Sequence, residues 1–288
     1  YSEENFNDCS NCPECCCVED YSDHTQLRDC MLLGLLDLKL SYQDTADKVV
    51  AFFNKCIDMG VAGFLIDAAK HIWPNDIDNI MDRTNDLPTE FFPQGTRPFV
   101  YLEVIDMNDP GEISGKEYSH LGRVTEFRYC AQVKDATAEL WQIPNLYNPD
   151  WDMLDYEDAY VFVDNHDNQR GHWSGIEILT HKEPREYQIA TAINLGYDYG
   201  YPSMMSSYYF EDTDIGPPSD DDYNTLDVTI NPDGSCGNGW VCEHRWTSIT
   251  GMVTFAKAVN GEPALDFWTE GNQAAWRRGN KGFVAISN

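Results

Sequence analysis

The spacing of apolar side chains divides most of the chain into alternating helices and strands. From residue 41 onward, apolar residues recur at helical spacing up to Ile57, and Gly60 follows as a stop signal. The next run, VAGFLID at 61–67, is apolar without alternation, as strands buried in parallel sheets are. We therefore predict a helix that ends near Gly60 and feeds a buried strand.

The same unit recurs further along the chain. The pattern predicts helices at 74–84, 134–141 and 184–195, and strands at 97–105, 122–129, 159–167 and 201–209. Alternating helices and strands indicate a parallel α/β sheet, and no glycine-rich phosphate loop suggests a nucleotide fold. A (β/α)8 TIM barrel fits best. A closed barrel takes eight strands in roughly 250 residues, whereas this chain offers only five, so three strands are expected outside it.

The remaining segments do not follow this pattern. Residues 1–30 show neither the helical nor the strand period, and they are expected to be a loop-rich segment held by cross-links. Residues 211–233 are rich in Asp, Pro and Gly and predict a long loop, while 274–287 predict two antiparallel strands of a different unit.

Charge and composition exclude several classes of protein. The chain has 49 acidic and 19 basic residues, a net charge of -30, which repels phosphate backbones and anionic lipids. Hydrophobic residues make up 42%, too many for a disordered acidic tail, and no uninterrupted apolar run approaches a membrane span. We expect a soluble globular protein that binds neither nucleic acid nor membranes.

Ten cysteines indicate an oxidising compartment and therefore a secreted protein. The chain opens with Tyr1 and shows no signal sequence, so we expect that a segment upstream has been removed or is not included. The spacings in CSNCPECCC could also bind zinc, but no histidine pair follows them, and disulfides are the preferred interpretation.

Three acids lie at or just beyond the carboxyl ends of predicted strands: Asp67, Glu103 and Asp167. That edge carries the active site of a barrel, where acids from different strands converge on one bond. Cleavage of a glycosidic bond needs a pair of carboxylates, one to protonate the leaving oxygen and one to attack the anomeric carbon. Acids at strand ends are also common in so acidic a chain, so their spacing alone leaves both interpretations open.

Five segments extend the argument: GFLIDAAKHIWPNDI, FVYLEVID, GRVTEFRY, FVDNHDNQRGH and CGNGWVCEHRW. In this order and spacing they resemble the signature segments of the animal-type α-amylases, over nearly the whole chain. The resemblance implies that Asp67 is the nucleophile, Glu103 the general acid/base, and Asp167 the carboxylate that bonds sugar hydroxyls and orients the acid.

The same resemblance assigns the binding residues. Those expected to contact sugars are Lys70, His71, Ile105 and His166, together with His172 on a loop that closes over substrate. Calcium is expected at the carboxylate of Asp37 and at main-chain oxygens of Arg28 and His71, since a hard cation prefers oxygen ligands. One further calcium ligand, an asparagine, is expected outside this chain.

The cysteine pairing implied by the resemblance is partial. Cys236 and Cys242 match a disulfide that closes a short loop, and Cys30 matches one that pairs back to Cys9 or Cys12. Cys56 and Cys130 have no counterpart and are expected to be buried free thiols.

The resemblance also divides the chain. It places 1–40 in a calcium-binding inserted domain, 41–270 in the C-terminal part of the catalytic barrel, strands 4 to 8, and 271–288 at the start of a C-terminal β-sandwich. The complete protein is expected to be a secreted monomer that hydrolyses starch, glycogen or maltooligosaccharides.

The chain departs from the family pattern at three places. Leu65, two residues before Asp67 and on the same face of the strand, replaces an arginine bonded to the nucleophile, and Ser203 replaces a second arginine. Of the chloride-binding residues only Asn165 remains, so chloride is not expected as a cofactor. The loop after the third carboxylate is altered to GHWSGIE. These departures leave open an amylase-like extracellular protein that binds glucan or a partner without hydrolysing it. The cysteine cluster alone leaves open a third interpretation, an acidic, cysteine-rich structural protein that uses the barrel as a scaffold.

Overall fold

The computed structural model describes residues 1–147, 149–172 and 176–288. They form two units, Tyr1–Glu126 and Phe127–Asn288. Among the residues so described, no helix is both long and apolar enough to cross a membrane. The division after Glu126 falls inside the predicted barrel segment 41–270 and does not test the predicted domain boundaries, which remain predictions.

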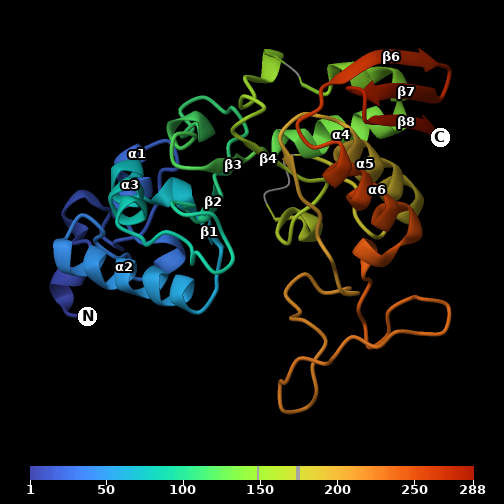
Figure 1. Ribbon diagram of the computed structural model, residues 1–288. Helices are drawn as coiled ribbons and strands as arrows, with labels where there is room; N and C mark the ends of the chain where they lie inside the picture. The colour runs from blue at the N-terminus through green and yellow to red at the C-terminus, as the bar shows by residue number, and fades with distance from the viewer. Residues whose placement is uncertain (148, 173–175) are drawn as a thin grey trace. The chain divides into compact units, whose positions relative to one another are not determined.

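The first unit is built on three short parallel strands (Figure 1). They pair in the order β1 (Gly63–Ile66), β2 (Phe99–Leu102) and β3 (Arg123–Thr125). Helix α2 (Gln43–Asp58) precedes β1, and helix α3 (Pro74–Asp82) lies between β1 and β2. This alternation of helices and parallel strands is the one that the apolar pattern predicts.

The two faces of β1 differ in what they meet. Phe64 packs edge to face against Phe53 of α2, with 4.6 Å between ring centroids. Side chains alternate along a strand, so Leu65 points away from α2, and it is 41% exposed. Helix α2 therefore covers the face of β1 that carries Phe64, and Leu65 lies on the opposite face.

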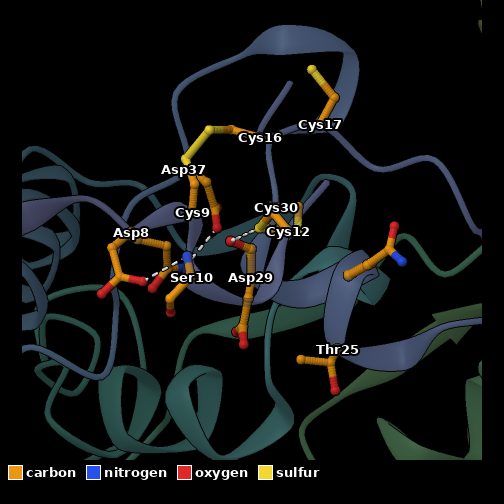
Figure 2. Close-up of a disulfide and its surroundings, with 12 residues drawn as sticks. Asp8, Cys9, Ser10, Cys12, Cys16, Cys17, Thr25, Asp29, Cys30 and Asp37 are labelled. Carbon is orange, nitrogen blue, oxygen red and sulfur yellow. Dashed lines mark hydrogen bonds between the residues drawn. A yellow bond between two sulfur atoms is a disulfide. The ribbon is translucent and has the colours of Figure 1, made fainter. Parts of the chain in front are cut away.

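Residues 1–42 form a cross-linked segment of short turns around helix α1 (His24–Asp29). Disulfides join Cys9 to Cys16 and Cys12 to Cys30 (Figure 2). The expected cross-linking of this segment is confirmed, and Cys12 is the partner of Cys30. The Cys9–Cys16 pair is an addition to the pairs that the sequence implied.

The second unit combines parallel strands, helices and a small antiparallel sheet. Strands β4 (Ala159–Val161) and β5 (Tyr201–Pro202) pair in parallel, and the helices are α4 (Arg128–Ala138), α5 (Pro184–Gly196) and α6 (Thr247–Ala258). The antiparallel strands are β6 (Ala264–Glu270), β7 (Gln273–Arg278) and β8 (Gly282–Ser287), in that order. Trp276 of β7 is buried and donates from Nε1 to the carbonyl of Gly196 (2.9 Å), which anchors this sheet at the end of α5.

Several predicted boundaries need correction. The strand predicted over 122–129 ends at Thr125, and helix α4 already begins at Arg128, whose guanidinium donates to the carbonyl of Trp151 (2.6 Å). The strand predicted at 201–209 has only two residues in the ladder. Helix α6 was not predicted, because its β-branched residues and Gly251 weaken the helical signal.

The pairing and burial of the other cysteines largely match what the sequence predicts. Cys236 and Cys242 form the expected disulfide. Cys130 is a buried free thiol, as expected, whereas the free thiol of Cys56 is only partly buried.

Candidate active site

Two of the predicted catalytic acids are neighbours at the carboxyl edge of the first unit's sheet. Strands β1 and β2 pair in register up to Ile66 and Leu102, and Asp67 and Glu103 are the next residues. The amide of Glu103 donates to the carbonyl of Ile66 (2.9 Å), which continues the ladder. Since adjacent strands lie about 4.8 Å apart, the two acids occupy adjacent positions on one edge.

A left-handed turn directly after Asp67 connects the two acids. Ala68 has φ 47° and ψ 36°, a conformation that costs a residue with a side chain about 1–2 kcal/mol. The turn directs the amide of Ala68 to Oε2 of Glu103 (3.0 Å), and the amide of Ala69 donates to the carbonyl of Glu103 (2.9 Å). Glu103 is 7% exposed, whereas Asp67 is exposed, so the acids stand in different surroundings, as a pair with separate roles requires.

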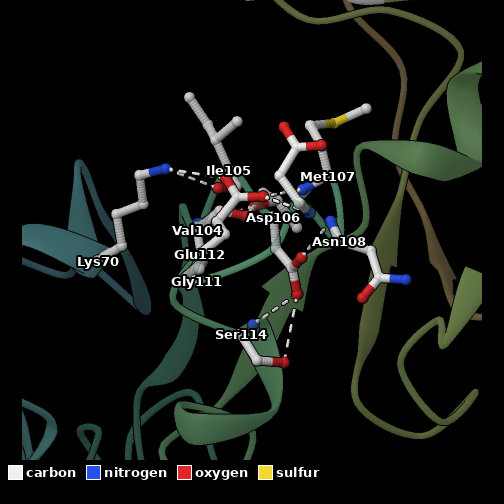
Figure 3. A network of polar contacts seen from close by, with 12 residues as sticks. Lys70, Val104, Ile105, Asp106, Met107, Asn108, Gly111, Glu112 and Ser114 are labelled. Carbon is white, nitrogen blue, oxygen red and sulfur yellow. Dashed lines mark hydrogen bonds and ion pairs between the residues drawn. The ribbon is translucent and has the colours of Figure 1, made fainter. Parts of the chain in front are cut away.

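The loop after β2 holds Lys70 inward (Figure 3). Lys70 is 9% exposed; its Nζ donates to the carbonyl of Ile105 (2.8 Å) and pairs with Oε1 of Glu112 (3.3 Å). Oε2 of Glu112 accepts from the amide of Met107 (2.8 Å). These contacts tie the turn after Asp67 to the loop after Glu103. Sequence reasoning missed Glu112, because its partner lies 42 residues away.

A second carboxylate organises the same loop. Asp106 is buried, and its Oδ2 accepts from the amide of Gly115 (2.9 Å) and the hydroxyl of Ser114 (3.3 Å). Its Oδ1 accepts from the amide of Asn108 (2.8 Å). Asp106, at the start of the loop that carries Ile105, and Glu112, in its second half, therefore hold the two arms of the loop together.

His71 links helix α1 to the turn that carries Lys70. Its Nδ1 lies 2.9 Å from the carbonyl of Leu27. A carbonyl oxygen can only accept, so Nδ1–H donates to it, and burial lowers the pKa of His71. The bond joins the side chain of His71 to the main chain of Leu27, the residue before Arg28, and Arg28 and His71 are the two residues whose main-chain oxygens are expected to bind calcium.

Asp37 is the carboxylate that the sequence predicts for the calcium site. Its side chain accepts from Nδ2 of Asn7 (2.6 Å). Burial raises the pKa of Asp37 to about 6, the Asn7 bond opposes this, and the charge of Asp29 adds to it. A partly buried carboxylate near a second acid is stabilised by a cation. Among the residues that the structure describes, no group of three or more His, Cys, Asp or Glu side chains could hold a metal ion.

Asp167 lies in the second unit, in the tight turn that follows β4. Oδ1 of Asn165 accepts from the amides of Asp167 (3.2 Å) and Asn168 (2.8 Å), and Oδ1 of Asn168 accepts from the amide of Asn165 (2.8 Å). His166 is exposed, with Nε2 at 3.6 Å from Oδ1 of Asp167. In this structure Asn165 therefore caps the turn that presents the third carboxylate.

His172 and Ser203 occupy their expected segments in the second unit. The amide of His172 donates to the carbonyl of Asp167 (3.2 Å), and the His172 side chain is exposed. The altered loop GHWSGIE includes residues 173–175, which lie outside the described residues. The amide of Ser203 donates to the carbonyl of Val161 (2.8 Å). The residue directly after β5 is therefore held by the backbone of β4, and its side chain is an uncharged serine.

Paired acids at the carboxyl edge of parallel strands that alternate with helices are the arrangement expected at the active-site edge of a (β/α)-barrel, and a carboxylate pair is what glycosidic cleavage uses. No family model matches the chain. Curated relatives do: α-amylase of Oryzias latipes is 46% identical over 304 residues, covering 100% of this chain and 59% of the relative. α-Amylase 1B of Homo sapiens is 45% identical over 287 residues, covering 94% of this chain and 56% of the relative.

Solved structures agree with these relatives. α-Amylase I of Eisenia fetida matches with a TM-score of 0.90 and 38% identity, covering 100% of this chain and 60% of that one. An Anoxybacillus α-amylase shares the fold, with a TM-score of 0.62 and 15% identity. The chain is homologous over its whole length to part of the animal α-amylases, and it spans little more than half the length of the curated relatives it matches.

Proposed function

We propose that the protein to which this chain belongs is an α-amylase, which cleaves internal α-1,4-glucosidic bonds of starch and glycogen with retention of configuration. The observation that carries the proposal is the adjacency of Asp67 and Glu103 at the end of paired strands. The identity of 43% to 46% with animal α-amylases supports the same activity.

The two neighbouring acids divide the work of a double displacement. Asp67, exposed on the sheet edge, attacks the anomeric carbon to form a glycosyl-enzyme, while Glu103 protonates the leaving oxygen and later takes a proton from water. Retaining enzymes hold these carboxyl groups about 5–5.5 Å apart, a separation that side chains on adjacent strands can adopt. Asp167, held in its own turn, hydrogen-bonds sugar hydroxyls in the transition state.

Maltooligosaccharides are the substrates that fit this proposal. A mutant of Eisenia fetida α-amylase I has been solved in complex with maltohexaose. In this chain Lys70, His71, Ile105, His166 and His172 would line the sugar subsites. Because Lys70 is already bound to Ile105 and Glu112, its main contribution would be to hold the subsite loop in shape.

Calcium is the cofactor that suits the N-terminal segment. Asp37 and the main-chain oxygens of Arg28 and His71 would hold the ion, which prefers several oxygen ligands. The ion would supply a cross-link between residues 1–40 and the turn that follows Asp67. Leu65 and Ser203 provide no positive charge for an anion, and we propose that chloride is not a cofactor.

The disulfides fit a protein that is secreted and acts outside the cell. A net charge of -30 disfavours binding to nucleic acid or to an anionic membrane surface. We propose that the complete protein acts as a monomer on starch, glycogen or maltooligosaccharides.

Hydrolysis of starch by the native polypeptide tests the proposal. Asp67→Asn and Glu103→Gln should each lower turnover by at least about 100-fold, since each removes a group that acts in the transition state. Asp78→Asn, at an exposed acid of α3, is the matched control and should be unchanged. Equal activity in all variants would refute the assignment, whereas glucan binding without turnover in the parent would favour the non-hydrolytic alternative.

A further inference from the structure

The turn that carries Asp167 is closed from behind by a buried hydrogen bond. Nε2 of Gln169 donates to Oδ2 of Asp164 (2.8 Å), which joins the residues at the two ends of the turn. Asp164 is 2% exposed and Gln169 is 6% exposed, so water competes little for this bond. It adds to the bonds between Asn165 and the amides inside the turn.

Both ends of the turn are also anchored in the core of the second unit. The hydroxyl of Tyr187, on α5, donates to Oδ1 of Asp164 (2.9 Å). Nε2 of Gln169 donates in addition to the hydroxyl of Ser207 (2.7 Å), and the amide of Ser207 donates to Oε2 of Glu243 (2.7 Å). Tyr187, Ser207 and Glu243 are all buried. The bonds form one chain that runs from α5 to the segment before α6.

This arrangement places two carboxyl groups in a buried site at a cost. Burial raises the pKa of Asp164 to about 7, and the charge of Glu243 adds to the shift, while the bonds from Gln169 and Tyr187 oppose it. His181 lies beside Glu243, with Nδ1 at 4.0 Å from Oε1, and burial lowers the pKa of His181. An apolar core would avoid this cost. What the acid supplies in return is a fixed attachment for Gln169.

We propose that Asp164 and Gln169 are positioning residues: together they form a clamp that holds the turn from Asn165 to Asn168, so that His166 and Asp167 face substrate in one orientation. The clamp residues act on Asp167 through the backbone and touch no reacting atom. Its catalytic consequence rests on the proposed function, because a displacement of 1 Å in a catalytic group costs about 100-fold in rate. The clamp itself is a property of the structure without substrate.

Hydrogen exchange measured by mass spectrometry on the native polypeptide tests the clamp directly. Gln169→Met keeps the volume of the side chain but removes its donor, and Gln169→Glu turns a carboxylate toward Asp164. Each should speed exchange of the amides of Asp167 and Asn168 at least tenfold. Thr137→Val is the matched control: it removes a buried hydroxyl of α4, which donates to the carbonyl of Val133 (2.7 Å), and should leave those amides unchanged.

A double variant provides the rescue that a merely structural role would not show. In the Gln169→Glu background, Asp164→Asn restores the clamp with its polarity reversed: the introduced amide donates to the introduced carboxylate and still accepts from Tyr187. Exchange at Asp167 and Asn168 should return to within threefold of the parent. In maltohexaose hydrolysis, kcat should fall at least tenfold in both Gln169→Met and Gln169→Glu, and the loss in Gln169→Glu should be recovered in the double variant, with KM changed less than threefold in all of them.

The outcomes separate the clamp from the proposed function. Unchanged exchange at Asp167 and Asn168 in both single variants, or global instead of local acceleration, would overturn the clamp. Accelerated exchange without rescue in the double variant would also overturn it. If the parent hydrolyses no glucan but the exchange results hold, the clamp stands and the proposed activity fails.

Discussion

Restoring a cation beside the nucleophile is the perturbation with the most informative consequence. In Leu65→Arg the new side chain would start two residues before Asp67 on the same face of β1, about 6.6 Å away along the strand. The guanidinium reaches that distance from its own backbone, and the 41% exposure of Leu65 indicates room for the longer side chain. The variant should therefore place a charged donor against the carboxylate of Asp67.

The size of the effect follows from the exposure of the pair. A hydrogen bond to a charged group contributes about 1.5–3 kcal/mol, and exposed ion pairs contribute less, about 0.2–1 kcal/mol. Position 65 is partly exposed, so a contact between the introduced arginine and Asp67 should contribute an energy between these two ranges. We expect roughly 1–2 kcal/mol of added transition-state stabilisation, which corresponds to about a five- to thirtyfold rise in kcat. KM should change little, because the arginine orients Asp67 and does not contact the sugar.

The assay is hydrolysis of a blocked maltooligosaccharide by the native polypeptide and its variants, with and without chloride. Leu65→Met is the matched control, since it preserves an apolar side chain of similar volume. The parent and the control should show low turnover without chloride dependence. Turnover in Leu65→Arg equal to that of the control, or vigorous chloride-stimulated activity in the parent, would show that residue 65 does not limit the nucleophile.

Three further outcomes test the structure. Excess chelator should lower Tm by about 5 °C, because calcium bound only to the folded state stabilises it. This response should disappear in Asp37→Ser, and an unchanged Tm in the parent would show that calcium does not bind at this site. Thiol titration should label Cys15 in the native state and Cys130 only after unfolding. Cys17 should react slowly with the thiol reagent, because its hydrogen bond with Cys15 raises its pKa. Rapid labelling of Cys130 in the native state would contradict its burial. Burial raises the pKa of Asp164 from 3.8 to about 7, so the folded state holds a proton on this carboxyl between those values. The contribution of Asp164 to stability should therefore fall as pH rises through that window, with a limiting slope of about 1.4 kcal/mol per pH unit. Urea unfolding of Asp164→Asn should lack this contribution and show a flatter pH dependence than the parent, and parallel curves would refute the shift.

Local signals made part of this fold predictable from the sequence. The apolar run at 61–67 predicted β1 and the acid at its end, because a buried strand is marked by its own residues. Helices α2, α3 and α5 were predictable from their apolar periodicity. Helix α6 has a weak apolar periodicity, so the sequence pattern did not predict it. Its helical structure depends on tertiary packing, which the local pattern does not report.

The parts of the site that could not be predicted depend on geometry or on distant partners. Ala68 adopts a left-handed conformation without a glycine to signal it. Glu112 acquires its role from Lys70, and Asp164 from Gln169 and Tyr187, through bonds that exist only after the chain has folded. The resemblance to α-amylases supplied the roles of Asp67 and Glu103, and the structure supplied their adjacency.

The configuration of the first product tests the central claim most directly. Proton NMR of maltohexaose during its hydrolysis by the native polypeptide resolves the α and β anomers before they equilibrate. If Asp67 attacks and Glu103 protonates, the initial product is the α anomer, and Asp67→Asn abolishes its formation. Initial release of the β anomer, or undiminished α anomer from Asp67→Asn, would contradict the account.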